Sequence, residues 1–213
     1  PALMAGNGGI LKHASNVQGC ALAMEEIIRE AGFPEDIFRV LLVGSKEVKS
    51  IIENTHIKAV TLTGSTPAGK AVASAAGSVL KKTVLELGGS DPYIILEDAD
   101  LEEAVNACVK SRMINGGQSC VAAKRFIVVD SLKKEFEELF VLKMKGFKMG
   151  DPFKEDTDLG PQARHDLRDE LHNQVLQSIK DGAKLLLGGT IPDNKGAFYP
   201  PTVLTDVKDG VLA

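Results

Sequence analysis

Cysteine is scarce in this sequence of 213 residues, which contains only Cys20, Cys108 and Cys120. The number is odd, and the three cysteines lack the short spacing that zinc ligands usually show. These features exclude a disulfide-rich secreted scaffold and a cysteine-based metal centre. Reduced thiols are typical of the cytosol, so we expect a cytoplasmic protein without a metal site.

Long hydrophobic runs are also missing. No apolar stretch reaches the ~20 residues needed to cross a bilayer, and no signal-peptide pattern opens the chain. Basic residues are in the minority, since 25 Lys and Arg stand against 29 Asp and Glu, for a formal net charge of -4. Lys143, Lys145 and Lys148 have the spacing of a solvated helix edge rather than of a phosphate-binding patch. We therefore expect neither a membrane nor a nucleic acid as a partner.

The two ends of the chain lack the usual boundary signals. The chain begins at Pro1 without an initiator methionine and stops at Ala213 without a clear final element. Neither an internal repeat nor a low-complexity tract interrupts it. We therefore expect this chain to be a piece of a longer protein.

The composition itself is that of an ordinary globular protein, with 44% hydrophobic and 25% charged residues. The length suffices for one large domain or two small ones. Short runs of branched apolar residues alternate with stretches of helical periodicity, and this rhythm predicts an α/β fold of parallel strands with helices on their faces. Strands are predicted at residues 10–11, 38–43, 59–63, 83–87, 93–96, 126–129 and 184–187. A double glycine, Gly88-Gly89, follows the fourth of these strands, and we place a domain boundary there, between residues 1–88 and 89–213.

Residues 64–69, Gly-Ser-Thr-Pro-Ala-Gly, connect the third predicted strand to the next helix. Pro67 suits the first helical turn, and Ser65 or Thr66 can cap it. The free N–H groups and partial positive charge of a helix N-terminus favour a phosphate, although the spacing differs from the three-glycine dinucleotide fingerprint. Two interpretations therefore stay open: a phosphate site, or a tight turn in which Gly69 eases helix packing.

Cys120 follows a glycine-rich turn, Asn115-Gly116-Gly117, which ends a helix predicted to reach about Ile114. Glycines in such a turn let the backbone approach a ligand closely, and loops of this kind commonly carry catalytic groups. A thiolate is a strong nucleophile toward carbonyl carbon. The competing interpretation is structural, because free cysteine is usually a small buried hydrophobe. For Cys108, on the apolar stripe of the preceding helix, packing is the default role.

Glu86 stands near the end of the strand predicted at 83–87 and is flanked by leucines. A positioned carboxylate can act as a general base on water. The alternative is an edge charge that faces solvent. If Glu86 is the base and Cys120 the nucleophile, both side chains must face one cavity.

Two further predictions concern a helix start and two histidines. Ser15 and Gln18 match a capping box, which would start a helix that ends before Gly32. His165 and His172 fall on the polar side of an amphipathic helix. We expect both histidines to be solvated, because no nearby residue completes a metal site.

Three motifs, in order and at matching spacing, make the chain resemble the aldehyde dehydrogenase superfamily. They are Val60-Thr61-Leu62-Thr63-Gly64-Ser65 through Gly69, then Glu86-Leu87-Gly88-Gly89, then Gly117-Gln118-Ser119-Cys120. Residues 1–7 with Lys12 are similar to the strand that brings a lysine to the adenosine ribose in this family. The similarity extends over essentially every residue. Within the family, residues 11–14, 85–92, 122–126 and 167–171 are most similar to bacterial succinate-semialdehyde dehydrogenases.

The resemblance implies a mechanism and an organisation. Residues 1–88 would be part of a Rossmann-like NAD(P)-binding domain, and residues 89–213 part of an α/β catalytic domain. Cys120 would attack the aldehyde, expected to be succinate semialdehyde, to form a thiohemiacetal, with its own N–H as an oxyanion donor. Glu86 would activate the water that hydrolyses the resulting thioester. The parent protein is expected to be a homo-oligomer.

The resemblance also implies a set of cofactor-binding positions for NAD or NADP. They are Lys12, Ser15, Gly64, Ser65, Leu87 and Gly88. Ser15 stands where many relatives have a glutamate that binds the adenosine ribose, which leaves room for a 2′-phosphate and keeps NADP open. Ile114 stands where many succinate-semialdehyde enzymes carry an arginine for the substrate carboxylate.

Two alternatives follow from the same comparison. An acylating enzyme would pass the acyl group to coenzyme A, but such enzymes tend to lack the glutamate found here at position 86. The family's oxyanion-hole asparagine, its nicotinamide-ribose carboxylate and its oligomerisation hairpin are expected outside residues 1–213. The chain would then be a catalytically incompetent fragment, acting at most as a binding or structural module.

Overall fold

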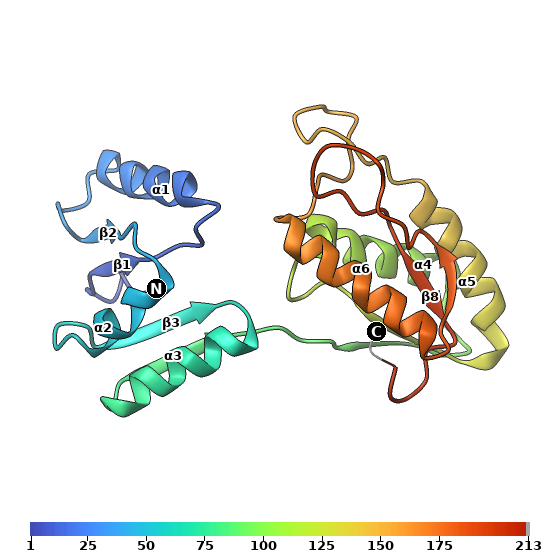
Figure 1. The fold of residues 1–213 in the computed structure, drawn as a ribbon, viewed down its shortest axis with the longest axis horizontal. Coiled ribbons are helices and arrows are strands. Elements are labelled where there is room, and N and C mark those ends of the chain that lie inside the picture. The colour runs from blue at the N-terminus through green and yellow to red at the C-terminus, as the bar shows by residue number, and fades with distance from the viewer. Residues whose placement is uncertain (212–213) are drawn as a thin grey trace. The chain divides into compact units, whose positions relative to one another are not determined.

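The computed structural model describes residues 1–211 and contains two compact units, Pro1–Gly88 and a second unit that begins at Gly89 (Figure 1). The first unit alternates short strands with helices. Its elements are β1 (Gly9–Leu11), α1 (Gln18–Glu30), β2 (Phe38–Val40), the 3-10 turn η1 (Ser45–Glu47), α2 (Val48–Glu53), β3 (Ala59–Thr63), α3 (Thr66–Ser78) and β4 (Lys82–Glu86).

The second unit repeats this alternation and then adds a hairpin-like pair of strands. Its elements are β5 (Pro92–Ile95), α4 (Leu101–Met113), the 3-10 turn η2 (Ile114–Gly117), β6 (Arg125–Val128), α5 (Asp130–Lys145), α6 (His165–Lys180), β7 (Lys184–Leu187) and β8 (Val203–Thr205). β1 pairs with β2, β3 with β4, and β5 with β6, each in parallel, whereas β7 and β8 are antiparallel. The predicted α/β fold with parallel strands is confirmed.

Side-chain caps mark the starts of two helices, of which the cap at Ser65 is one that the sequence predicts. The hydroxyl of Ser65 accepts the N–H of Ala68 at 3.4 Å, with Pro67 in the first turn of α3. Asp100 Oδ1 accepts the N–H of Glu103 at 3.0 Å at the start of α4. Each cap satisfies a backbone donor that has no partner inside the helix.

The capping box predicted at Ser15 is wrong. Helix α1 begins at Gln18 with Val17 at the N-cap, and no side chain caps it. The N–H of Val17 donates to the carbonyl of Ala14 at 3.2 Å, so Ser15 lies inside a turn that precedes the helix. Ser15 is exposed, and its hydroxyl does not cap α1.

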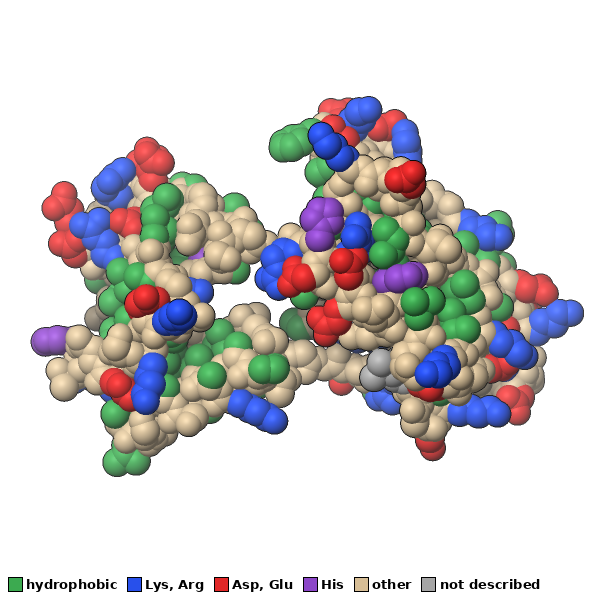
Figure 2. All heavy atoms as spheres, in the orientation of Figure 1, with side chains coloured by type: hydrophobic (Ala, Val, Ile, Leu, Met, Phe, Trp, Pro, Cys, Tyr) green, Lys and Arg blue, Asp and Glu red, His purple; other side chains and the backbone are tan. Residues whose placement is uncertain are grey.

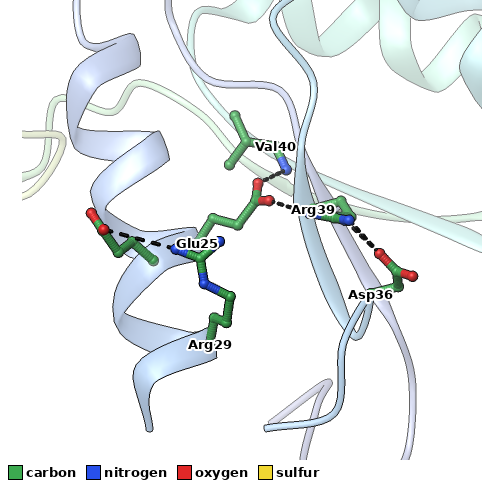
Figure 3. A network of polar contacts seen from close by, with 6 residues as sticks. Glu25, Arg29, Asp36, Arg39 and Val40 are labelled. Carbon is green, nitrogen blue, oxygen red and sulfur yellow. Dashed lines mark hydrogen bonds and ion pairs between the residues drawn. The ribbon is translucent and has the colours of Figure 1, made fainter. Parts of the chain in front are cut away.

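A carboxylate fixes α1 against β2 (Figure 3). Glu25 Oε2 accepts the N–H of Val40 at 2.6 Å, and its other oxygen accepts from Arg39 Nη1 at 2.8 Å. Arg39 in turn donates to Asp36 Oδ1 at 2.6 Å. The hydrogen bond from Arg39, followed by that from Val40, lowers the pKa of Glu25. This charge-assisted network sets the position of the helix that follows Lys12 and Ser15.

Each unit has its own hydrophobic core. In the first unit, α2 and α3 bury Ile52, Val72 and Ala76 against β3 and β4. In the second, α4 and α5 cover β5 and β6, and the rings of Phe136 and Phe140 stack with centroids 5.5 Å apart. Burial of side chains of this size stabilises a fold by about 1.5–3 kcal/mol each. These cores hold the strand ends and loops described below.

The surface is mixed in charge, and acidic and basic side chains are interspersed on the face drawn in Figure 2. Among the helices within residues 1–211, none combines the length and the hydropathy needed to span a bilayer. The prediction that both histidines of α6 are solvated is wrong for His172, which is half-buried. His172 Nδ1 lies 3.1 Å from the hydroxyl of buried Tyr199, a partner contributed by a loop 27 residues later.

Candidate active site

Cys120 is exposed on the loop that connects η2 to β6, as the sequence predicts. Cys108, in contrast, is only 3% exposed on the inner face of α4, and burial raises the pKa of its thiol to about 11. Cys20 is exposed on α1. The packing role predicted for Cys108 is confirmed, and Cys120 is the exposed thiol of the second unit within the described residues.

Three consecutive residues with positive φ reverse the chain before Cys120. They are Asn115 (φ 50), Gly116 (φ 62) and Gly117 (φ 78). This region of backbone space is open to glycine and tolerable for asparagine. The sequence Asn-Gly-Gly therefore suits this reversal, which ends the α4–η2 segment and turns the chain into the Cys120 loop.

Side chains hold this loop through its backbone carbonyls. Arg112 donates to the carbonyls of Gly117 at 3.1 Å and Ala123 at 3.0 Å. Lys124 Nζ donates to the carbonyl of Cys120 itself at 3.1 Å. Gln118 Oε1 accepts the N–H of Ala163 at 2.8 Å, which ties the loop to the segment that precedes α6. The loop geometry thus depends on side chains as well as on the turn.

Sequence reasoning missed Arg112 and Lys124. One signal could have found Arg112: it is a basic residue in the last turn of a helix, where cations commonly bond free carbonyls. Lys124 carries no comparable signal, because its partner is a loop carbonyl four residues earlier.

Glu86 is the last residue of β4 and pairs in register with Thr63, the last residue of β3. Its side chain is exposed, and its carbonyl accepts the N–H of Gly64 at 2.9 Å. Glu86 belongs to the first unit and Cys120 to the second. The requirement that both face one cavity stays a prediction.

The predicted cofactor residues lie after strand ends of the first unit. Lys12 is half-buried directly after β1, with exposed Ser15 in the turn beyond it. Gly64 and Ser65 connect β3 to α3, a helix of 13 residues whose N-terminus can accept a phosphate. Ligands of open parallel sheets bind outside the carboxyl ends of the strands. The donor set present, a lysine, a serine hydroxyl and helix N–H groups, therefore fits a dinucleotide.

Leu87 and Gly88 follow β4, where Leu87 is half-buried and Gly88 is exposed. A Cβ added to Gly69 of α3 would approach the Cδ2 and Cδ1 atoms of Leu87 to 2.7 and 2.8 Å. Gly69 thus admits the Leu87 side chain against α3. This contact supports the packing interpretation of Gly69 and leaves the phosphate interpretation of the helix start intact.

Within residues 1–211, no group of three or more His, Cys, Asp and Glu side chains is arranged to hold a metal ion.

Residues 1–212 match the model of the aldehyde dehydrogenase family. The chain belongs to the aldehyde dehydrogenase family. This finding confirms the resemblance seen in the three sequence motifs, whose residues are those discussed above: the β3–α3 turn, the end of β4 and the Cys120 loop.

Two curated members of the family illustrate the similarity. A protein of Synechocystis sp. named probable succinate-semialdehyde dehydrogenase [NADP(+)] is 54% identical over 207 residues, which cover 97% of this chain and 46% of the relative. The succinate semialdehyde dehydrogenase [NAD(P)+] Sad of Escherichia coli is 51% identical over 213 residues, covering 100% of this chain and 46% of the relative. The chain therefore spans a little under half the length of these aldehyde dehydrogenases.

A solved aldehyde dehydrogenase structure shows the same fold. The succinic semialdehyde dehydrogenase of Streptococcus pyogenes, in complex with NADP+, superimposes with a TM-score of 0.89 at 37% sequence identity. The match covers 92% of this chain and 43% of that structure. The α/β architecture is thus that of the aldehyde dehydrogenase fold.

Proposed function

We propose that the full-length protein containing this chain oxidises succinate semialdehyde to the carboxylic acid, with NADP+ as its preferred cofactor. The observation that carries the proposal is Cys120, an exposed thiol on a loop fixed by side chains, within the Gly-Gln-Ser-Cys box of an aldehyde dehydrogenase. The names of the similar proteins support the substrate and the cofactor.

In the first step, the Cys120 thiolate forms a bond to the aldehyde carbon, and the carbonyl oxygen becomes an oxyanion. Within residues 1–211 the N–H of Cys120 donates to no backbone carbonyl. This donor is therefore free to bind the oxyanion, which is the kind of interaction that stabilises a transition state most.

The residues of the first unit would hold NADP+, which when bound would accept the hydride that the thiohemiacetal carbon loses. Cys120 then carries the acyl group as a thioester. Glu86 takes a proton from water, the hydroxide adds to the thioester carbon, and the carbon–sulfur bond breaks. The products are the carboxylic acid, the reduced cofactor and the regenerated Cys120 thiolate, and the proton held by Glu86 is released to solvent.

The first unit would hold the cofactor through the strand ends described above. Lys12 would bind the adenosine ribose, and Ser65 with the N–H groups of α3 would bind the pyrophosphate. Gly64, Leu87 and Gly88 would line the site. Exposed Ser15 leaves space for the 2′-phosphate of NADP+.

The test is an assay of the full-length protein with succinate semialdehyde and each cofactor, followed by the absorbance of the reduced nicotinamide. We expect Cys120→Ala to abolish turnover while circular dichroism stays unchanged. Cys20→Ala, which removes another exposed thiol, should keep full activity. Turnover that survives Cys120→Ala, or a wild-type protein silent with both cofactors, would contradict the proposal. An assay of the 213-residue chain alone measures whether it turns over by itself.

A further inference from the structure

We infer that Arg112 is a positioning residue that fixes the loop bearing the nucleophile, an inference that rests on the role proposed for Cys120. Arg112 lies in the last turn of α4 and does not belong to the family motifs quoted above. Its function would be to hold the backbone on both sides of Cys120 in one conformation.

The geometry is a bridge across the loop. Arg112 Nη2 donates to the carbonyl of Gly117, three residues before Cys120, and Nη1 donates to the carbonyl of Ala123, three residues after it. One rigid planar group thus joins the two ends of a seven-residue segment with Cys120 at its centre. Lysine, with a single ammonium, cannot reproduce this fixed fork.

The environment of Arg112 shows that the bridge is more than a surface contact. Ala123, one of its acceptors, is only 1% exposed, so its carbonyl depends on a protein donor. Burial lowers the pKa of the Arg112 guanidinium, and no carboxylate within residues 1–211 pairs with it. A half-buried cation without an acidic partner is costly. Its donors are instead directed at the loop carbonyls.

Gly117 is shaped to accept this guanidinium. A Cβ added at Gly117 would lie 2.1 Å from Arg112 Nη2 and 2.8 Å from its Cζ atom. Gly117 also has a φ of 78°. Glycine at this position therefore allows both the turn and the close approach of Arg112, and the two residues form one interlocked unit.

The functional consequence concerns the precision with which Cys120 is presented. Lys124 holds the carbonyl of Cys120, but it is an exposed and flexible side chain. Without Arg112, the loop would sample more conformations, and the sulfur and the oxyanion-binding N–H would be aligned in fewer of them. A misplacement of about 1 Å can cost roughly 10²-fold in rate.

The experiment compares Arg112→Met and Arg112→Lys with wild type in the full-length protein. Hydrogen exchange of peptides covering residues 114–124 measures the order of the loop, and steady-state kinetics measure kcat and KM for the aldehyde. The matched control is Arg168→Met, because Arg168 is also largely buried and donates to a carbonyl, that of Gly196, but makes no hydrogen bond to residues 114–124.

We expect loop amides to exchange roughly tenfold faster in Arg112→Met, with Arg112→Lys in between. We expect kcat to fall about 10–100-fold while KM changes little, because substrate binding does not use Arg112. If Arg112→Met fails to fold, the comparison of Arg112→Lys with wild type carries the test. Unchanged loop exchange in a folded variant would overturn the inference. A loosened loop with unchanged turnover would also overturn the inference, whereas turnover that survives Cys120→Ala would contradict the proposed function.

Discussion

Lys133 Nζ lies 2.6 Å from Asp206 Oδ1, and this ion pair joins the beginning of α5 to the residue that follows β8. Lys184 Nζ, from β7, lies 2.7 Å from the other oxygen of the same carboxylate. The hydrogen bonds from Lys133 and then Lys184 lower the pKa of Asp206 from its ordinary 3.8 to about 2. One carboxylate therefore links three elements of the second unit.

Because of this link, we expect the free energy of unfolding to depend on pH in the acid range. Because the pKa of Asp206 is lower in the folded state than in the unfolded chain, its contribution is complete above the unfolded value of 3.8 and is lost as the pH falls through about 2. We expect Asp206→Asn to unfold at lower urea concentration than wild type at neutral pH, with the difference narrowing below about pH 4. Asparagine tolerates the positive φ of 54° at this position.

A second aspartate supplies the control for this titration. Asp193 is exposed and forms no ion pair within residues 1–211, so Asp193→Asn should leave the urea midpoint close to wild type at every pH. A difference for Asp206→Asn that stays constant down to strongly acidic pH would show that this carboxylate is not held by the two lysines.

Glu86→Gln should separate the oxidation step from the hydrolysis step. Glutamine cannot take a proton from water, so the thioester on Cys120 should accumulate after one hydride has been transferred. We expect a burst of about one equivalent of reduced cofactor, followed by turnover reduced roughly 10²-fold or more. Stopped-flow absorbance measures both phases. Glu30→Gln, another exposed glutamate of the first unit, should behave as wild type, and a Glu86→Gln enzyme with normal steady-state turnover would rule out the proposed base.

Ser15→Glu should move the cofactor preference from NADP+ toward NAD+. A carboxylate at this exposed position would repel the 2′-phosphate and could accept hydrogen bonds from a ribose hydroxyl. We expect kcat/KM for NADP+ to fall about 10–100-fold and that for NAD+ to hold or rise. Ser45→Glu adds the same charge elsewhere in the first unit and should change neither value. Equal losses with both cofactors in Ser15→Glu would argue against a site for the 2′-phosphate beside Ser15.

Two glycines of α3 should respond in opposite ways to alanine. Gly77 has open space at its Cβ position, so Gly77→Ala should stabilise the protein by about 0.5–1 kcal/mol through better helix propensity. Gly69→Ala should lose this gain, because the new methyl group forces Leu87 to move. If Leu87 lines the cofactor site, KM for the cofactor should rise in Gly69→Ala alone. Thermal unfolding and cofactor titration measure these effects, and identical behaviour of both variants would refute the contact.

The sequence predicted the bounds of those strands whose ends are set by turn residues directly beside them. The strands at Ala59–Thr63 and Lys184–Leu187 have the predicted bounds, since turn residues flank both. The strand predicted at 38–43 ends at Val40, and the one predicted at 83–87 lies one residue earlier, at Lys82–Glu86. Their bounds follow the partner strand, because Phe38–Val40 pairs residue for residue with Gly9–Leu11 and Lys82–Glu86 with Ala59–Thr63.

The candidate site divides in the same way between local and long-range features. The loop of Cys120 and the cap at Ser65 arise from neighbouring residues and were predictable. The contact of His172 with Tyr199 joins residues far apart in sequence, so the sequence pattern did not predict it. Ser15 lies in a turn that begins at Ala14, and this turn places it outside the N-cap position of α1. Arg112 donates only to main-chain carbonyls, which every residue carries, so no particular residue type in the sequence indicates its partners.

The pairing of Thr63 with Glu86 limits which insertions this part of the chain can accept. This one residue pair fixes both the point at which the chain leaves β3 toward α3 and the face of the sheet on which the Glu86 side chain lies, because neighbouring strand residues point to opposite faces. A side-chain substitution in β3 or β4 leaves this register in place. An insertion of one residue into β4, however, would turn the Glu86 side chain to the other face of the sheet. An insertion of one residue into β3 would shift the start of α3 relative to Glu86.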